Sequence, residues 1–395
     1  MLFTSSFPYF GGEQFLETEI EYLSKSFSKI VIVPLKKHQK LRSIPDNVVV
    51  DNFITNTKSR HFFKMKSLFG KYFLTNFSFN INDIKYLFKN AVYVENYKKW
   101  IDRFLKKNKI DECLFYSYWF EAPTSALSLV KTKKSDLKFV TRVHGGDLFE
   151  NLYGLDKFPG RQKIISNITK IFSVSTNGKN HIVNNYITTK EKIEVSRLGV
   201  KGNENLSKAS KDGKLRIVSC SSLIPLKRVN LIIEGLHQLK SKNIEIIWTH
   251  IGDGELKIKL ENESKIKLGG KIEYNFLGYL TNKEVLQFYK NNPTDVFINT
   301  SSSEGIPVSI MEAHCFGIPV IATDVGGIKE IVNLGNGFLL SKNPTDKEIA
   351  KAIFDVINKK YEWKKKRIES FENWGKKFNA ELNYKNFTNN LKKLL

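Results

Sequence analysis

The sequence predicts an α/β protein with two doubly wound parallel sheets, and three observations lead to this fold class. Short apolar segments rich in β-branched residues, such as Ile30–Pro34 and Leu215–Ser222, alternate with longer segments whose apolar residues recur at helical spacing. This alternation is typical of parallel strands joined by crossover helices. The pattern stops in a polar, glycine-containing segment at residues 201–214 and then starts again. The 395 residues, of which 41% are apolar, are sufficient for two cores.

We therefore expect an N-terminal domain over residues 1–200, a linker over 201–214 and a second domain over 215–370. The final segment, residues 371–395, carries an apolar stripe at helical spacing and is expected to form a C-terminal helix. In the first domain the pattern is clear at its start and again from Cys113 onward. Between residues 36 and 109 it indicates helices and basic-aromatic segments without clear boundaries.

The individual elements follow from the same patterns. Further strands are expected at Cys113–Trp119, Lys138–Asp147, Ile171–Ser175, Ile193–Val200, Ile244–Glu255, Ile272–Val285 and Asp295–Thr300. Helices are expected at Pro123–Val130, Gln162–Thr169, Val229–Leu239 and Ser309–Phe316, and near Asn177. Thr281 and Glu284 are spaced as a capping box.

The strand, loop and helix from Asp295 to Phe316 are the most informative unit of the chain. Backbone amides at the start of a helix have no partners within it, so the loop is a natural seat for an anion, and a phosphate is the expected ligand. Glu304 and Glu312 flank the seat and can accept hydrogen bonds from hydroxyl groups. This combination predicts a sugar-nucleotide site. The residues expected to supply the seat are Gly305, Ile306, Pro307 and Val308.

The stretch Ser301–Val332 resembles the donor site of the retaining glycosyltransferases of family 4. It carries two glutamates in E-x7-E spacing, followed by A-x-x-x-G-I-P-V-I-A-T-D-V-G-G-x-x-E. The resemblance is strong over Leu215–Val332 and weaker in the first domain. It implies the GT-B architecture, with two Rossmann-like domains facing each other across a cleft and the donor mostly on the second. It also implies that the C-terminal helix packs back on the first domain.

The resemblance implies roles for residues of the second domain. Glu304 would hold the sugar hydroxyls, Glu312 the ribose, and the backbone of Gly278, Tyr279 and Leu280 would lie beside the nucleobase. Lys227 and Arg228 lie in a strand-to-helix loop, where cations could neutralise the diphosphate and stabilise the charge that grows on it as the sugar leaves. Family members often carry an arginine just after this strand, where the present chain has Ser222.

In the first domain, Gly11, Gly12 and His144 are the expected site residues. A glycine pair at a strand-to-helix turn lets the backbone approach a ligand closely, and in the family this turn faces the donor diphosphate and the acceptor. His144 ends a strand, where ligands of open α/β sheets bind, although a lone histidine often has a structural role. The resemblance puts it near the transferred sugar, with Arg142 and Asp147 as weaker neighbours.

The formal net charge of +23 raises the question of an anionic partner. We find no signature of a nucleic-acid-binding motif and expect no nucleic-acid partner. Lysines mix with aromatic residues at residues 58–73 and 97–109, as at an anionic membrane surface. The alternative is a lysine- and asparagine-rich composition that places lysine on every solvated face.

Other features indicate a protein of the cytoplasm, and the basic-aromatic segments favour a peripheral location at the inner face of the cytoplasmic membrane. Cys113, Cys220 and Cys315 lack metal-ligand spacing and indicate neither a disulfide framework nor a zinc site. We expect no signal peptide and no transmembrane helix.

We therefore expect a retaining transferase that moves a hexose-type sugar from a nucleoside-diphosphate sugar to a saccharide or lipid-linked saccharide, in the synthesis of capsule, exopolysaccharide or lipopolysaccharide. No residue stands out as a covalent nucleophile, and the resemblance implies front-face attack. The absence of an Asp-x-Asp motif predicts no essential divalent metal, and we expect no cofactor. The alternatives are a sugar-nucleotide epimerase of the same fold and a non-catalytic sugar-nucleotide or membrane-binding module.

Overall fold

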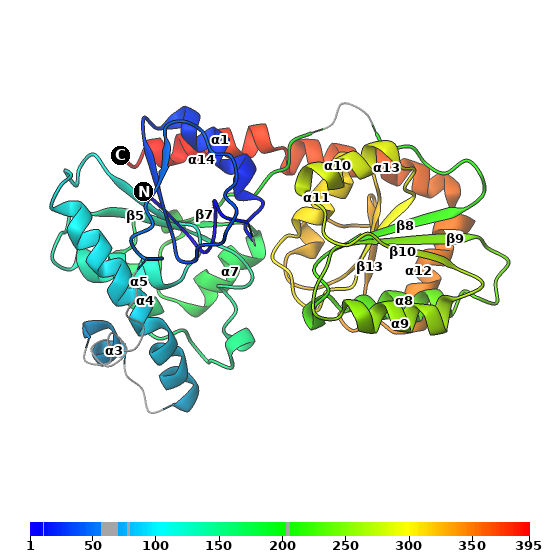
Figure 1. Ribbon diagram of the computed structural model, residues 1–395, viewed down its shortest axis with the longest axis horizontal. Coiled ribbons are helices and arrows are strands. Elements are labelled where there is room, and N and C mark those ends of the chain that lie inside the picture. The colour runs from blue at the N-terminus through cyan, green and yellow to red at the C-terminus, as the bar shows by residue number, and fades with distance from the viewer. Residues whose placement is uncertain (11, 57–69, 77–79, 203–205) are drawn as a thin grey trace. The chain divides into compact units, whose positions relative to one another are not determined.

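The computed structural model describes residues 1–10, 12–56, 70–76, 80–202 and 206–395 (Figure 1). These residues form two compact units, each with its own parallel sheet. The first unit is Met1–Arg197 together with Asn383–Leu395, and the second is Leu198–Leu382. The prediction of two doubly wound α/β domains is confirmed.

The sheet of the first unit has seven strands in the described part of the chain, in the order β3-β2-β1-β4-β5-β6-β7, all parallel. The chain runs from the central β1 to one edge, then returns to β4 beside β1 and continues to the other edge. The strand order therefore reverses between β1 and β4, which is where open α/β sheets bind ligands. The strands are β1 Leu2–Thr4, β2 Ile30–Pro34, β3 Val48–Val50, β4 Leu114–Ser117, β5 Lys138–Val143, β6 Lys170–Ser173 and β7 Ile193–Val195.

Helices cover both faces of this sheet (Figure 1). Alternate residues of β2 enter two cores: Val31 and Val33 pack in the core that includes α4 and α5, and Ile30 and Ile32 in the core that includes α1. The helices are α1 Leu16–Ser26, α3 Lys71–Asn76, α4 Ile81–Leu105, α5 Ala122–Lys131, α6 Arg161–Asn167 and α7 Thr176–Asn185, with short 3-10 turns at Glu150–Tyr153 and Lys190–Lys192.

The interpretation of residues 97–109 as a mixed basic-aromatic surface is wrong. Most of this tract belongs to α4, whose inner face carries the aromatic residues into the core. Tyr97 and Trp100 are 1% and 3% exposed, and both pack edge-on against Phe3 at 5.4 Å between ring centroids. The outer side of the tract carries charged and polar residues, among them Lys99, Asp102 and Arg103. Of the other tract, residues 57–69 lie outside the described residues.

The sheet of the second unit has six parallel strands within the described ranges, in the order β10-β9-β8-β11-β12-β13. Its order reverses between β8 and β11. The strands are β8 Leu215–Cys220, β9 Ile246–Ile251, β10 Glu273–Phe276, β11 Val296–Asn299, β12 Val320–Thr323 and β13 Gly337–Leu340.

In this unit α8, α9 and α12 cover one face of the sheet, and α10, α11 and α13 cover the other (Figure 1). The predicted capping box is confirmed at the start of α10, where the Thr281 amide donates to Glu284 Oε2 at 2.7 Å. No helix among the described residues is both long and apolar enough to cross a membrane. The helices are α8 Val229–His237, α9 Lys257–Leu268, α10 Asn282–Asn291, α11 Val308–Cys315, α12 Asp346–Asn358 and α13 Lys360–Lys377.

The C-terminal segment consists of two helices, because α13 ends at Lys377 and α14 runs from Ala380 to Lys392. The break is held by Val200, whose amide donates to Phe378 O at 3.0 Å and whose carbonyl accepts from Ala380 N at 3.1 Å. From Asn383 onward the chain belongs to the first unit. There Phe387 is 1% exposed and packs edge-on against Phe172 at 5.0 Å.

Candidate functional site

The loops that follow the two central strands of the second sheet meet at its switch point. The loop after β8 ends in a 3-10 turn at Pro225–Lys227, and the loop after β11 carries Glu304. Lys227 Nζ lies 2.6 Å from Glu304 Oε1, and the two side chains are 20% and 11% exposed. Sequence spacing could not indicate this contact between residues 77 positions apart. The structure thus brings together two of the predicted catalytic side chains at one ligand-binding edge.

Among the described residues, all the hydrogen bonds to the Glu304 carboxylate are made to one of its two oxygens, Oε1. Besides Lys227, Oε1 accepts from Ser301 Oγ at 2.7 Å and from Asn299 Nδ2 at 3.5 Å. Oε2 accepts no hydrogen bond in the described part of the chain. The carboxylate is therefore fixed in orientation while one oxygen keeps its full capacity to accept from a ligand hydroxyl.

Arg228 has a different environment from the one we expected. Its guanidinium donates to Thr300 O at 2.8 Å, to Ser301 O and Lys342 O at 2.9 Å, and to Asn343 Oδ1 at 3.0 Å. Four of its five donors are thus used by protein acceptors. Arg228 therefore holds the loop after β11 in this structure, and its expected contact with the diphosphate stays a prediction.

The predicted anion seat precedes α11, which begins at Val308 with Pro307 as its N-cap residue. The amides of Gly305, Ile306, Val308 and Ser309 donate to no acceptor among the residues that the structure describes. Amides that point out of a helix start, together with the helix dipole, favour a bound anion. The geometry is therefore compatible with the predicted phosphate seat, which would lie beside Lys227 and Glu304.

Two glycines after β12, Gly326 and Gly327, pack closely against the backbone of the loop that contains Glu304 and Gly305. Gly326 has a φ of +54°, and a Cβ there would lie 1.8 Å from the Glu304 carbonyl oxygen. A Cβ at Gly327 would lie 2.2 Å from Gly305 O, and the Gly327 amide donates to that oxygen at 2.9 Å. No other residue fits in either position, which is the physical reason for the two glycines in the motif.

Glu312 lies on α11 and is buried, with a hydrogen bond from Asn282 Nδ2 at the start of α10. Burial raises the pKa of Glu312 to about 8, and the Asn282 bond lowers it in part. The carboxyl group is therefore largely protonated at neutral pH. The same hydrogen bond links α11 to α10, which follows the expected base-binding loop directly.

The expected base-binding loop is Gly278, Tyr279 and Leu280. Gly278 O accepts from Gly252 N at 2.8 Å, so the loop is tied to the turn after β9. The Tyr279 side chain is 52% exposed, and Leu280 beside it is half-buried. Besides the backbone edges that we predicted, the loop thus offers an exposed aromatic ring on which a base can stack.

In the first unit, His144 follows β5 and lies among aromatic rings. Its ring centroid is 4.4 Å from Trp119 and 4.8 Å from Tyr118. Neither ring nitrogen forms a hydrogen bond in the described part of the chain; Nδ1 lies 3.8 Å from Asp147 Oδ2. Both ring nitrogens are buried, so in this structure only the position of His144 at the end of β5 points to a ligand site.

Its two expected neighbours are structural. The Asp147 carboxylate is buried and accepts from the amides of His144 and Phe120, both at 2.7 Å. Arg142 is fully buried and pairs with Glu19 at 3.3 Å. Both side chains are occupied by protein groups and shape the end of β5.

Gly11 lies outside the described residues, and Gly12 packs near Ser6 in the loop after β1. The neighbouring Glu13, which sequence analysis missed, fills this loop. Its carboxylate accepts from the amides of Ser5, Ser6 and Phe7 at 2.8, 2.7 and 2.6 Å and from Trp119 Nε1 at 2.6 Å. An internal anion therefore occupies the amides that could otherwise bind a phosphate, and the expected donor contact of Gly11 and Gly12 stays a prediction.

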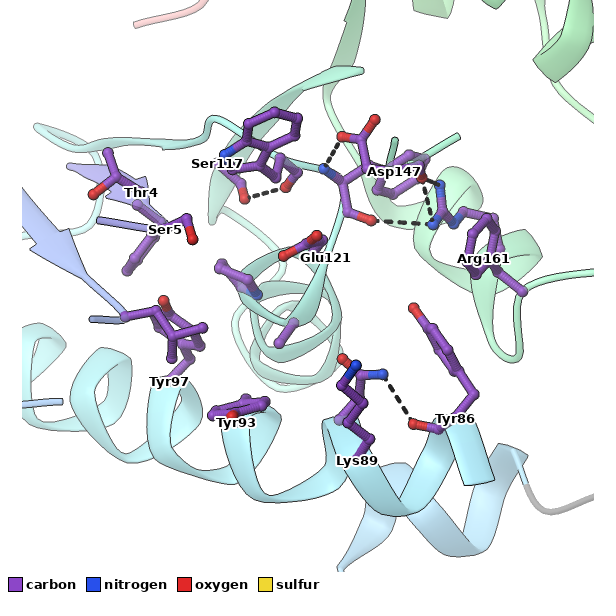
Figure 2. Close-up of a pocket in the computed structure, with 18 of the residues that line it drawn as sticks. Thr4, Ser5, Tyr86, Lys89, Tyr93, Tyr97, Ser117, Glu121, Asp147 and Arg161 are labelled. Atoms are coloured by element: carbon purple, nitrogen blue, oxygen red, sulfur yellow. Dashed lines mark hydrogen bonds between the residues drawn. The ribbon is translucent and has the colours of Figure 1, made fainter. Parts of the chain in front are cut away.

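A pocket of about 240 Å³ opens at the carboxyl ends of β1 and β4, the switch point of the first sheet. Figure 2 shows Glu121 in the space between the tyrosines of α4 and the strand ends near Ser117 and Asp147. Tyr86, Tyr93 and Tyr97 form the α4 wall, and Lys36 and Lys89 are also among the lining residues. The walls thus combine aromatic rings, hydroxyls and the carboxyl groups of Glu121 and Asp147.

Glu121 is the N-cap residue of α5, and its side chain borders this pocket. Burial raises the pKa of Glu121 to about 7, with a further increase from Asp147, while Arg161 lowers it. Sequence analysis missed this residue because the facing wall of the pocket is α4, and α4 lies in the region whose sequence pattern was unclear. The sequence did contain one signal of a site: Glu121 is an acidic residue between the end of a strand and a helix that has proline in its first turn.

Comparison with known proteins agrees with this geometry. Residues 201–377 match the family described as Glycosyl transferases group 1. The amylovoran biosynthesis glycosyltransferase AmsK of Erwinia amylovora is 31% identical over 153 residues, which is 36% of each chain. The O-antigen biosynthesis glycosyltransferase WbnH of Escherichia coli is 42% identical over 72 residues, or 18% of this chain and 20% of that protein. The chain spans less than half the length of these curated relatives.

Solved structures match over the whole chain. HepE of Anabaena, in complex with UDP and glucose, has a TM-score of 0.67 at 17% identity and covers 99% of this chain and 98% of its own. The lipopolysaccharide outer core galactosyltransferase WaaB has a TM-score of 0.67 at 18% identity, and the match covers 100% of this chain and 99% of WaaB. Residues 201–377 of this chain thus match the group 1 glycosyltransferases, and the whole chain has the two-sheet GT-B fold of these solved structures.

Proposed function

We propose that the protein is a retaining glycosyltransferase that moves a hexose-type sugar from a nucleoside-diphosphate sugar to an acceptor hydroxyl. The observation that carries the proposal is the Lys227–Glu304 pair beside unpartnered amides at the switch point of the second sheet. A cation and free amides suit a diphosphate, and a half-engaged carboxylate suits a sugar hydroxyl. A relative with bound UDP and glucose supports a UDP-hexose as the first donor to test.

The chemistry needs a stabilised leaving group and a held sugar. In the proposed reaction, the bond between the anomeric carbon and the phosphate oxygen breaks. The acceptor oxygen bonds to the same face of that carbon, and its proton passes to the departing phosphate oxygen. Lys227 and the amides from Gly305 to Ser309 would stabilise the diphosphate as its charge grows. Glu304 Oε2 would accept from a sugar hydroxyl, and Glu312 would face the ribose.

We propose the pocket of the first unit as the acceptor site. Its aromatic walls suit the apolar faces of a saccharide, and Glu121 can accept a hydrogen bond from an acceptor hydroxyl. His144 stays a candidate for contact with the transferred sugar, because it directly follows β5 at the sheet edge where ligands of open α/β sheets bind.

Relatives named for amylovoran, O-antigen and lipopolysaccharide outer core biosynthesis support a bacterial surface polysaccharide as the product. A saccharide or lipid-linked saccharide is then the acceptor, and the cytoplasmic side of the membrane is the proposed location. We also propose that no divalent metal is essential, because Lys227 and the helix amides supply positive charge at the diphosphate. Activity that EDTA abolishes and magnesium or manganese restores would overturn this point.

The first test is a thermal-shift screen against UDP, GDP, ADP and their common sugars, for the wild type and Glu312→Ala. A ligand at a hundredfold excess over its Kd stabilises the folded state by about 2.7 kcal/mol. We expect a shift from one base family that the substitution weakens. No shift from any nucleotide would contradict the donor site.

A second assay separates the alternatives. Nucleotide release that depends on an added saccharide acceptor is expected for a transferase. Turnover of the sugar nucleotide without acceptor would favour an epimerase, and base-specific binding without turnover would favour a non-catalytic module.

A further inference from the structure

A second cavity, of about 570 Å³, lies within the second unit at the amino ends of β8 and β11. Residues 206–214 form one side, and α12 and α13 form the other. The proposed donor loops leave the carboxyl ends of the same strands. The cavity is therefore at the opposite edge of the sheet from the donor site and has no part in the function proposed above.

The polar groups in the cavity wall are already satisfied by the protein. The Asp295 carboxylate accepts from Ser210 N at 2.9 Å, Ser210 Oγ at 2.6 Å and Arg216 N at 2.9 Å. Arg367 donates to Thr294 O at 2.8 Å and to Ser207 Oγ at 2.9 Å. What remains for a ligand is mainly apolar surface, since the other lining residues include Leu206, Val356, Ile357, Trp363 and Ile368. Such an interior favours a hydrocarbon chain over a polar molecule.

The rim of the cavity is cationic. Lys211, Lys214, Lys360 and Lys364 border it, and only Lys214 has an ion pair within the described ranges, to Glu245 at 3.2 Å. Lys360 and Lys364 belong to α13, which also carries two exposed side chains that suit a membrane interface: Tyr361 is 71% exposed and Ile368 is 53% exposed. Lysines beside exposed aromatic and aliphatic residues are typical of helices that lie on anionic bilayers.

We propose that this cavity binds an anionic membrane lipid. The acyl chain lies against Trp363 and Ile357, and the headgroup lies among the four lysines. The apolar interior favours binding of the acyl chain, and the lysines at the rim favour a negatively charged headgroup. The site holds the second unit at a bilayer surface and is independent of nucleotide binding.

Vesicle flotation of the full chain is the first test, with phosphatidylcholine vesicles that contain or lack phosphatidylglycerol. We expect binding only when phosphatidylglycerol is present, and at least tenfold weaker binding for Lys211→Glu/Lys364→Glu. Lys347→Glu/Lys351→Glu on α12 is the matched control, because it changes the net charge equally away from the cavity. An equal loss in both double variants, or equal binding to pure phosphatidylcholine, would overturn the proposal.

Acyl-chain contact is tested by fluorescence. Phosphatidylglycerol with brominated chains quenches tryptophans that touch the chains, and the protein has five. We expect most of the quenching to disappear in Trp363→Phe, while the thermal shift from nucleotide stays unchanged in all these variants. Vesicle binding with the same quenching in wild type and Trp363→Phe would exclude the cavity as the lipid site. If a variant lost only the thermal shift caused by nucleotide and still bound vesicles, that result would concern the donor site and would leave the lipid site unaffected.

Discussion

The ammonium of Lys227 lies 2.6 Å from Oε1 of Glu304, so one ion pair joins the loops after the two central strands of the second sheet. The pair sets a positive charge beside the proposed phosphate seat and fixes the carboxylate that would hold the sugar. Both side chains are mostly buried, so water does not readily replace either partner of the ion pair.

Lys227→Ala should lower kcat/KM by about 100-fold to 1000-fold, the usual loss when a group that stabilises developing charge is removed. Steady-state kinetics with donor and acceptor measures it. Lys267→Ala is the matched control, because Lys267 pairs with Glu234 and Glu263 on α8 and α9. Equal kinetics for wild type and Lys227→Ala would remove Lys227 from the catalytic residues.

Arg228→Ala should lower the free energy of unfolding by about 3 kcal/mol, since charged hydrogen bonds to the loop carbonyls are lost. Arg228→Gly should be less destabilising by about 0.5–1 kcal/mol, because glycine relieves the φ of +47°. Urea denaturation of both variants measures the difference. Unchanged stability with a weaker affinity for the nucleotide would instead support direct contact with the diphosphate.

Gly326→Ala should destabilise the protein and weaken donor binding, because its Cβ would meet Glu304 O at 1.8 Å. Gly213→Ala separates this clash from backbone strain: Gly213 also has a positive φ, but no atom lies within 4 Å of the added Cβ. We expect a loss of about 1–2 kcal/mol for Gly213→Ala and a larger loss for Gly326→Ala. Similar losses, with donor affinity intact, would contradict the close packing behind the loop.

Glu312 makes stability depend on pH. Its folded pKa of about 8 exceeds the ordinary value of 4.5, so between these values the folded state holds a proton that the unfolded state has released. The contribution of Glu312 to stability should therefore be greatest below about pH 4.5, fall as the pH rises to about 8, and change no further above that value. Urea denaturation at several pH values should show a shallower fall for Glu312→Gln. Identical pH profiles would contradict the buried acid.

Glu121 should govern acceptor recognition. Because its pKa is about 7, the fraction ionised rises through neutral pH, and the acceptor KM should fall as the carboxylate forms. Glu121→Gln should have an acceptor KM that is higher and independent of pH across this range, with donor affinity unchanged. Initial rates at varied acceptor concentration and pH measure both. An unchanged acceptor KM in Glu121→Gln would place the acceptor elsewhere.

Local patterns in the sequence determined the alternating elements, the capping box at Thr281 and the donor loop with Glu304. These features depend on neighbours in the chain: the period of apolar residues, the residues at helix starts, and glycines where a side chain cannot fit. The break between α13 and α14 escaped notice because the apolar stripe continues through it, and a distant residue, Val200, holds it.

Only the tertiary structure decided which distant groups meet. It turned the aromatic residues of α4 inward and committed Arg228 to carbonyls of two other loops. It filled the loop after β1 with the Glu13 carboxylate and assembled the pocket around Glu121 from elements far apart in the chain. The physical reason is that burial and hydrogen bonding depend on the residues that surround a group in space, and a residue's type and sequence spacing do not specify those surroundings.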